Sequence, residues 1–526
     1  MSALRAVFGV ALADFRERSR SSQLLVVPVL VAYFAKVVTV DSTLVVADQY
    51  TGVPTAAWYG GMVMGIGTTV LLLAGFPLVK GSLARDRQTN VAPLVGTSPI
   101  PDWQYLIGKW ISNVAVLSIA TAVLALATNV AFILDGTGAL NPLPLWLPFI
   151  LVTVPAMGFV GAATLCFETI GFLRGTAGTV LYFLVVLTAI SASLVTSVPI
   201  DLTGIALLRD SMGTAITTQY PAFEGPIRTF AYTSTGGAVN TFRWPGLAVT
   251  QQTVGSRLPI VALTGGLLSI APVAFDRFNE PSSRVPAFLR RHSPDDMAES
   301  NDTTAQGPVS SAATSFDIDS LAPVESGEFD SVRVVMTELR MALRGHRRLW
   351  YLACIAGFVS TAVVPLQSLK TVVIPLVLLL ALPVWSALGL REQTYRTEEL
   401  VFVASNPLRL LSVSYVVGVV FGAILILPAL VRLVMNGTPA ALIGPLVAIG
   451  CLPAVALAAG ILSSQPSVFE IAYLTAWYIG PMNGVEPLDY IRADPSTSPT
   501  VSVAYLALMV VALAVAVLGR RRQLRS

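Results

Sequence analysis

The chain has 526 residues, of which 54% are hydrophobic and only 12% are charged. A soluble domain carries about 25% charged residues, so this composition excludes a soluble enzyme, a nucleic-acid-binding protein and a disordered protein. The formal net charge of +3 is small, and the placement of the charges along the chain is more informative than their sum.

Apolar runs long enough to cross a bilayer as helices recur along the whole chain. We therefore predict an all-α membrane protein with about twelve transmembrane helices. The predicted spans are 24–40, 59–79, 110–134, 145–167, 176–199, 257–275, 349–366, 371–390, 411–435, 441–463, 468–481 and 499–519.

The distribution of Lys and Arg predicts the orientation, because cytoplasmic loops carry an excess of these residues. With both termini in the cytoplasm, 25 of the 33 Lys and Arg residues lie on the inner side and 8 on the outer side. We expect a multi-pass protein of the cell membrane with cytoplasmic N- and C-termini.

A polar stretch divides the chain into two parts with six predicted spans each. Residues 276–330 are rich in Ser, Pro, Asp and Glu and lack apolar periodicity, which predicts a disordered acidic cytoplasmic linker. We predict a first six-span half at 1–275 and a second at 331–526.

Each half opens with a segment whose apolar residues follow helical spacing and whose end is basic. A shift of 324 residues aligns Asp14 with Glu338 and Arg16 with Arg340. An apolar stripe with basic residues next to a span predicts an amphipathic helix in the membrane interface. Its marker residues are Phe8, Leu12, Phe15 and Arg16 in the first copy and Val335, Leu339 and Arg340 in the second.

A second shared feature is the long loop after the second span of each half. Each copy has a polar stretch, a short apolar patch and a Ser-Pro or Asn-Pro stop, which initiates a turn. A loop of this length is longer than a simple reversal needs, so we expect it to contact a partner. The residues assigned to this contact are Arg85, Asp86, Thr97, Ser98 and Pro99 in the first copy and Glu392, Glu398, Glu399, Ser405 and Pro407 in the second.

In these features the chain resembles the permease of type-2 ABC exporters. That family has six spans per half, an interfacial helix before the first span, and a loop with acidic residues, Gly-Thr, Ser-Pro and a following Gly-Lys. The matching residues are Gly96-Thr97-Ser98-Pro99 with Gly108-Lys109 in the first half, and Glu398-Glu399-Leu400 with Ser405 and Pro407 in the second. The first copy departs from the pattern, because residues 90–95 lack the usual glutamates.

The resemblance implies that the two loops are coupling helices that dock on nucleotide-binding subunits. The sequence has no G-x-x-x-x-G-K-[ST] phosphate-binding motif. The resemblance therefore implies a non-catalytic subunit that binds no cofactor itself and is driven by two copies of a separate cytoplasmic ATPase, which uses ATP. Its other partners would be the lipid bilayer and an unidentified substrate, with no nucleic acid.

Two other functions fit the same pattern of spans. Twelve spans with a central linker also describe secondary transporters of the major facilitator type, and Gly81-Ser82-Leu83-Ala84-Arg85-Asp86-Arg87 is close to that family's loop motif. Mid-membrane ionisable residues, which mark the transport path of ion-coupled carriers, are scarce here. A non-transporting membrane scaffold is the third possibility.

Few residues indicate chemistry. The three cysteines lie in separate apolar runs, and the two histidines are far apart, so we expect no metal site of the His/Cys kind and no enzymatic activity. Sparse charge in the spans favours an apolar or amphipathic cargo. The 29 Arg against 4 Lys, with the acidic linker, favour a prokaryotic source, such as a salt-adapted archaeon.

Overall fold

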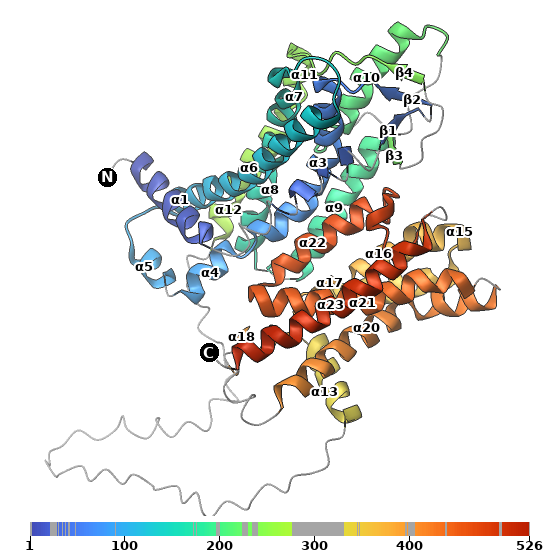
Figure 1. Ribbon diagram of the computed structural model, residues 1–526. Coiled ribbons are helices and arrows are strands. Elements are labelled where there is room, and N and C mark those ends of the chain that lie inside the picture. Colours follow the sequence, from blue (N-terminus) through green and yellow to red (C-terminus); the bar gives the residue numbers. More distant parts are fainter. Residues whose placement is uncertain are drawn as a thin grey trace, which may run out of the picture.

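The computed structural model describes most of the chain outside the predicted linker (Figure 1). The described residues are 3–20, 29, 31–33, 35–36, 38–39, 43–47, 49–89, 91–171, 173–174, 176–195, 200–223, 230–233, 240–275, 331–344, 346, 348–394, 397, 406–436, 439–493 and 497–524. The linker 276–330 lies outside them, as does most of the first predicted span, 24–40.

The described chain is predominantly helical, and seven of its helical segments are long and apolar enough to cross a membrane. They are Ala56–Arg87, Asp102–Asp135, Pro142–Thr169, Gln251–Ala274, Pro407–Met435, Ala440–Ser463 and Pro499–Gln523. Shorter apolar helices occupy Leu181–Ser193, Arg348–Val363 and Leu366–Leu379. The chain is a helical membrane protein, as its apolar runs predict.

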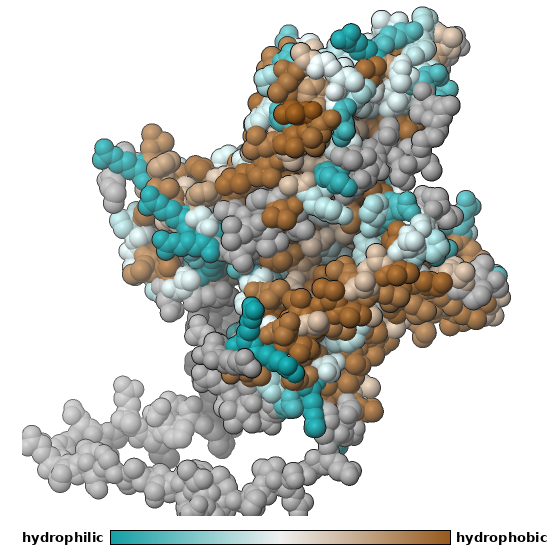
Figure 2. Space-filling view, in the orientation of Figure 1, coloured by the Kyte–Doolittle hydropathy of each residue, from teal (hydrophilic) through white to brown (hydrophobic). Residues whose placement is uncertain are grey.

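The surface agrees with this assignment. Figure 2 shows hydrophobic residues along the helices α20, α21 and α23, and hydrophilic residues over α1. Large apolar side chains such as Leu427, Val503 and Val510 are at least half exposed. In a soluble protein a surface of this kind would be an interaction patch, whereas here it is the surface that lipid covers.

The helices of the first part are α1 (Ala3–Ser19), α3 (Ala56–Val79), α4 (Ser82–Gln88), α5 (Ala92–Thr97), α6 (Asp102–Asp135), α7 (Pro142–Pro148), α8 (Val154–Thr169), α9 (Thr176–Val195), α10 (Ile205–Gln219), α11 (Gln251–Gly255) and α12 (Leu258–Ala274). A π-helical turn, η1 (Phe149–Thr153), joins α7 to α8.

The helices of the second part are α13 (Ser331–Leu343), α14 (Arg348–Val363), α15 (Leu366–Ser368), α16 (Ile374–Leu379), α17 (Leu382–Trp385), α18 (Arg391–Thr394), α20 (Pro407–Met435), α21 (Ile443–Ser463), α22 (Pro466–Ile479) and α23 (Pro499–Gln523). Short turns η5 (Leu369–Val373), η6 (Pro439–Leu442) and η7 (Glu486–Leu488) lie between them.

A helix coincides with every predicted span after the first, although one span differs in form. The predicted single span 371–390 begins earlier, at Leu366, and is broken after Leu379. Proline explains the breaks. Pro375 and Pro383 each lie in the first turn of a new helix, and proline has no backbone N–H group that could donate to the preceding helical turn. The grouping into two six-helix halves remains a prediction.

Helix α3 lies at the centre of the molecule. All of its residues are buried, and it packs against α6, α7 and α8 and, from the second part of the chain, α22 (Figure 1). A helix that is apolar on every side is expected in the interior of a bundle.

Several helix pairings recur in the two parts of the chain. Helix α1 packs on α6 as α13 packs on α20, and α12 packs on α8 as α23 packs on α21. The interfacial helix and the third predicted span of each part are therefore neighbours. This recurrence is what the predicted duplication would produce.

Both interfacial helices and the loop helices α4, α5 and α18 lie at one end of the bundle, together with the described C-terminus (Figure 1). We call this the loop end. The opposite end carries a small four-stranded sheet that sequence analysis did not predict. Its strands are β1 (Thr43–Val46), β2 (Tyr50–Gly52), β3 (Phe230–Thr233) and β4 (Asn240–Phe242), in the order β3-β1-β2-β4.

The long segment 200–256 is folded over much of its length. Its sequence alone was compatible with an outer gate, a small ectodomain or a passive loop. The segment contains α10 and α11 and supplies two strands of the sheet. Buried Asp201 accepts hydrogen bonds from the backbone of Gly204 (2.9 Å) and Leu207 (3.2 Å) and so fixes the start of α10. Trp244 is buried against Gly61 of α3, where a Cβ atom would come within 2.3 Å of its ring.

Candidate functional site

Lys109 lies at the centre of a buried ionic cluster at the loop end. Its Nζ atom is 2.6 Å from Oδ1 of Asp14 in α1 and 2.7 Å from Oδ1 of Asp86 in α4. All three side chains are at most 5% exposed. One ammonium group of α6 therefore connects the interfacial helix to the first predicted coupling loop.

The second carboxylate oxygen of Asp14 is also occupied. It forms an ion pair with Arg18 Nε at 2.8 Å and accepts a hydrogen bond from Ser112 Oγ at 2.5 Å, and Arg18 Nη2 in turn donates to Asn113 Oδ1 at 2.7 Å. Burial alone would raise the pKa of Asp14, but the positive charges of Arg18 and Lys109 and the hydrogen bonds outweigh it, and the pKa is lowered. Asp14 is thus held as a carboxylate.

Asp86 has a comparable set of partners. Its second oxygen accepts a hydrogen bond from the Tyr105 hydroxyl, and Lys109 also donates to the Ser82 carbonyl oxygen at 3.4 Å. Because buried charges are costly unless they are paired and hydrogen-bonded, these contacts fix α4 on α6. We call Asp14, Arg18, Asp86, Tyr105, Lys109, Ser112 and Asn113 the Lys109 cluster.

A second contact holds the beginning of α4. One carboxylate oxygen of Glu168, at the end of α8, accepts from the backbone N–H of Gly81 at 2.5 Å, and the other accepts from Leu83 at 2.9 Å. Ser82 donates to the same carboxylate through its N–H and its hydroxyl. The carboxylate satisfies N–H groups that have no partner within the helix, and its charge suits a helix N-terminus. Gly81 has φ +88°, which favours glycine.

Gly108, next to Lys109, explains how closely α1 approaches α6. A Cβ atom at this position would lie 2.8 Å from Val10 Cβ and 2.9 Å from the Val7 carbonyl oxygen. Gly108 thus allows the close contact between α1 and α6, and the adjacent Lys109 supplies the buried cation. Sequence analysis noted the pair as the start of a span and did not assign either residue to the site.

The predicted residues of the first loop separate into two groups. Asp86 is buried in the Lys109 cluster and Arg85 beside it is half-buried. Thr97 and Pro99 are exposed, and Ser98 is half-buried. The structure thus assigns Asp86 to the contact between α4 and the bundle rather than to the surface.

The outward side of this loop is formed by α5. Leu94 is 71% exposed, and Val91 just before the helix is also exposed, whereas Val95 packs on a small core that contains Tyr105. Helix α5 thus packs on the bundle through Val95 and leaves Leu94 accessible.

The second part of the chain has a related but different arrangement. Glu338 of α13, which the 324-residue shift aligns with Asp14, forms an ion pair with Arg391 of α18 at 2.6 Å. Burial raises the pKa of Glu338, although the charge of Arg391 partly opposes this. Glu392 pairs with Arg520 at 3.5 Å. In both parts, a carboxylate of the predicted interfacial helix therefore forms an ion pair with a basic side chain of another helix.

Of the predicted residues in the second loop, Glu392 is buried and forms the ion pair with Arg520. Pro407 begins α20, where the Asn406 side chain accepts from the Leu408 N–H at 3.0 Å. Glu398, Glu399 and Ser405 lie outside the described residues, so their contacts remain predictions.

Both predicted interfacial helices are present as α1 and α13. On α1, Phe8 and Arg16 are exposed while Leu12 and Phe15 are half-buried. On α13, Val335 and Leu339 are half-buried and Arg340 is exposed. The side of α1 that packs on α6 carries Asp14 and Arg18 as well as apolar residues, which a stripe drawn from apolar residues alone does not predict.

Among the described residues, the carboxylates of Asp14, Glu17 and Asp86 approach one another closely enough to bind a metal ion. The Lys109 ammonium group already bridges two of the three. A cation would have to displace this ammonium, so the chemistry of the cluster is that of an internal ion pair.

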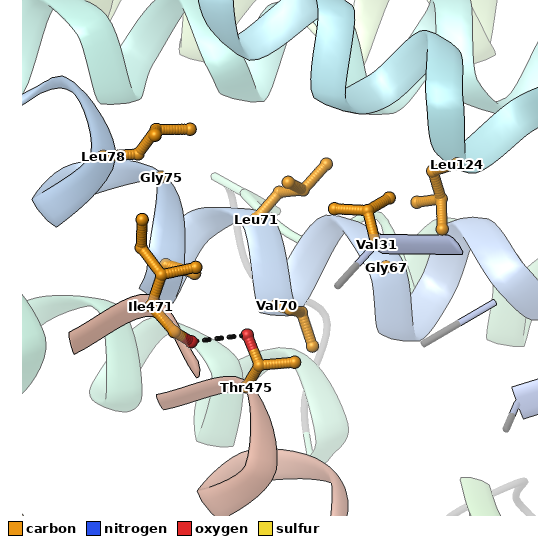
Figure 3. A pocket seen from close by; sticks show the side chains of 10 residues that line it. Val31, Gly67, Val70, Leu71, Gly75, Leu78, Leu124, Ile471 and Thr475 are labelled. Carbon is orange, nitrogen blue, oxygen red and sulfur yellow. Dashed lines mark hydrogen bonds between the residues drawn. The ribbon is translucent and has the colours of Figure 1, made fainter. Parts of the chain in front are cut away.

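Helices α3 and α22 meet at a seam between the two parts of the chain. Figure 3 shows side chains of α3 and α22 on either side of a small apolar cavity, with Val70 near Thr475 and Ile471 near Gly75. The cavity has a volume of about 20 Å³, enough for one water molecule. The seam is closed in this conformation.

Hydrogen bonds hold the two helices of the seam to their own parts. Trp477 of α22 donates to the Pro375 carbonyl oxygen of α16 at 2.9 Å. Tyr182 of α9 donates to the Leu72 carbonyl oxygen of α3 at 2.6 Å. Across the cavity shown in Figure 3 the lining is apolar except for Thr475. Separation of α3 from α22 at the cavity would break mainly apolar contacts, whereas elsewhere along the two helices the Tyr478 and Thr69 side chains form a hydrogen bond.

Comparisons with models of known protein families and with curated proteins find no match to this chain. The function is therefore argued from the geometry of the loop end and of the seam.

Proposed function

We propose that the chain is the membrane-spanning permease subunit of an ATP-binding cassette exporter. In this proposal two copies of a separate cytoplasmic ATPase dock on α4–α5 and on the segment 391–407, at the loop end. Their closure on ATP would move these loops and open the seam between α3 and α22, with six spans on each side.

The observation that carries the proposal is the Lys109 cluster. Because Lys109 contacts Asp14 and Asp86 at once, α4 cannot shift without drawing α1 and α6 with it or breaking two buried ion pairs. Breaking a buried pair is strongly unfavourable. A force applied to α4–α5 would therefore reach the membrane helices as a concerted movement.

The charge distribution supports a cytoplasmic loop end. Basic residues are concentrated there, as the preference for positive charge on the cytoplasmic side predicts. Described members are Arg5, Arg16, Arg20, Arg85, Arg87, Arg340, Arg344, Arg409, Arg520, Arg521 and Arg522.

The direct test is purification of the chain from its native membrane in mild detergent, followed by identification of what accompanies it. We expect a soluble subunit with a phosphate-binding loop, at two copies per chain. A chain that purifies alone under several gentle conditions would contradict the proposal and favour a secondary transporter.

A substitution on α5 tests the docking surface. We expect Leu94→Glu to reduce stimulation of the ATPase at least roughly tenfold, because an apolar anchor at the centre of an interface dominates the binding energy. The control is Leu140→Glu, the same change at an exposed leucine just before α7, which lies at the end of the bundle opposite the loop end (Figure 1). Equal stimulation in the two variants would remove α5 from the interface.

Charge reversal of Glu398 and Glu399 to Lys tests the second loop. We expect several-fold weaker ATPase stimulation with normal folding and membrane insertion, because a reversed charge opposes the complementary surface of the partner. The readout is ATP hydrolysis by the reconstituted complex at two salt concentrations, since screening should narrow the difference. Unchanged hydrolysis at low salt would contradict docking at these residues.

A further inference from the structure

Helix α22 separates two cavities. One side of the helix faces the closed seam with α3, and the other faces a pocket of about 240 Å³ between α21, α22 and α23. Thr475 lines both cavities. The pocket lies close to the seam without being part of it.

The pocket is aromatic, and none of the described residues that line it is acidic or basic. Four tyrosines line it, namely Tyr33, Tyr473, Tyr490 and Tyr505, together with Phe469 and aliphatic residues of the three helices. Tyr33 comes from the first part of the chain, so both parts contribute. We call this cavity the aromatic pocket.

Two of its hydroxyl groups are poorly satisfied. Tyr473 and Tyr490 are at most 2% exposed, and apart from each other their hydroxyl oxygens have no hydrogen-bond partner among the described residues. Two hydroxyls that share one hydrogen bond leave one O–H donor unused. A buried donor without an acceptor is costly, which points to an acceptor supplied by a ligand.

The pocket opens towards the lipid-covered surface. Tyr33 is 50% exposed and Leu508 is 43% exposed at its edge, and α23 continues beyond Leu508 with the exposed apolar residues Val510 and Val511. A molecule dissolved in the bilayer can reach the pocket sideways, without passing through water.

These features define the ligand class. The apolar lining requires an apolar body, the absence of charged lining groups excludes a charge inside the pocket, and the unused tyrosine hydroxyl requires a hydrogen-bond acceptor. The volume is below the range typical of pockets for drug-sized ligands, so it suits one chain or ring system of a larger molecule.

We propose that the aromatic pocket is a lateral binding site for an uncharged, acceptor-bearing part of a membrane-dissolved amphipath, such as an acyl chain with its ester carbonyl. The binding site itself is argued from the pocket. Only the further assignment of the bound amphipath as transport cargo, held next to the closed seam, rests on the proposed function. A tightly held structural lipid has the same chemistry, and the experiment distinguishes the two.

The probe is a monoacylglycerol with a diazirine in its acyl chain, added to the full chain in phosphatidylcholine vesicles containing some phosphatidylglycerol. We expect saturable photolabelling of peptides within 451–508 that excess unlabelled monoacylglycerol suppresses. A diazirine-bearing alkane, which lacks the acceptor, should label these peptides several-fold less. Labelling that does not saturate, or that spreads evenly over exposed helices, would overturn the proposal.

Two variants and a matched control locate the probe. Ala476→Phe places a ring in the pocket and should abolish saturable labelling. The double variant with Tyr473→Phe and Tyr490→Phe removes both hydroxyls and should weaken labelling about threefold to tenfold through the lost hydrogen bond. Leu446→Phe, on the lipid-exposed side of α21, should label like the parent chain. Equal labelling of Ala476→Phe and Leu446→Phe would contradict the site.

Cys451 provides a second readout that does not depend on the photoprobe. It lines the pocket and is 1% exposed. In a chain with Cys166→Ala and Cys354→Ala, monoacylglycerol should slow its reaction with a membrane-permeant maleimide. An unchanged rate at saturating monoacylglycerol would contradict occupancy of the pocket.

Addition of the ATPase and ATP distinguishes a bound cargo from a bound structural lipid. Turnover should lower the labelling of a cargo and leave that of a structural lipid unchanged, so unchanged labelling during turnover would overturn the cargo assignment. If no ATPase accompanies the chain but labelling remains saturable and sensitive to Ala476→Phe, the proposed function fails while the binding site stands.

Discussion

Lys109→Met is expected to destabilise the protein by about 3–5 kcal/mol. The substitution keeps the length of the side chain but leaves the carboxylates of Asp14 and Asp86 buried without their shared cation. Removing one partner of a buried ion pair has an effect of this size. The measurement is reversible denaturation in mixed micelles, compared with the parent chain.

The control for this variant is Lys370→Met, at a half-buried lysine of η5 outside the cluster. It should change stability by less than about 1 kcal/mol, as substitutions away from such clusters usually do. A double variant with Lys109→Met and Asp86→Asn should recover part of the loss, because Asp14 keeps its ion pair with Arg18 and Asp86 no longer carries a buried charge. A loss below about 1 kcal/mol in Lys109→Met would contradict the role of the cluster.

Glu168→Ala is expected to release the beginning of α4 while the membrane helices stay folded. The variant removes the acceptor for the N–H groups of Gly81, Ser82 and Leu83. Hydrogen bonds to a charged group contribute about 1.5–3 kcal/mol each. Local opening of α4 should then become roughly a hundredfold more frequent, and amide hydrogen exchange of peptides covering residues 81–88 measures it.

Glu470→Ala is the matched control for Glu168→Ala. Glu470 is a half-buried acid in the first turns of α22, and among the described contacts it accepts no backbone hydrogen bond from a neighbouring helix. Exchange of the 81–88 peptides should be unchanged in this variant. If Glu168→Ala leaves exchange at its parent value, then α4 is held by the Lys109 cluster alone.

The sequence was sufficient to predict a helical membrane protein and the approximate positions of its long apolar helices, whereas the arrangement of twelve spans remains a prediction. A bilayer of fixed thickness requires an apolar run of fixed length, and such runs are visible without any knowledge of packing. The interfacial helices could be predicted for a similar reason, since one-sided helical periodicity is local. Proline positions alone do not show that 371–390 is broken, because Pro428 and Pro453 lie inside continuous helices.

The Lys109 cluster was not predicted as a site, although sequence analysis had named Asp14, Asp86 and Lys109 separately. Lys109 lies 95 residues from Asp14 and 23 from Asp86, and sequence spacing does not show which distant acids it meets. A usable signal was present, because a lysine near the start of an apolar helix requires a partner and Asp14 interrupts an apolar stripe. Glu168 was not assigned to the site either, although its carboxylate caps the start of α4.

The sequence by itself determined that this protein is embedded in a membrane, where most of its apolar helices lie along the chain, and which loops are longer than a simple reversal needs. These properties depend on hydrophobicity and local periodicity. Only the tertiary structure decided that Asp86 faces inward, that α3 and α22 close a seam, and that strands from 43–52 and 230–242 form one sheet. Those features depend on contacts between residues far apart in the chain, which are fixed by packing and charge pairing in three dimensions.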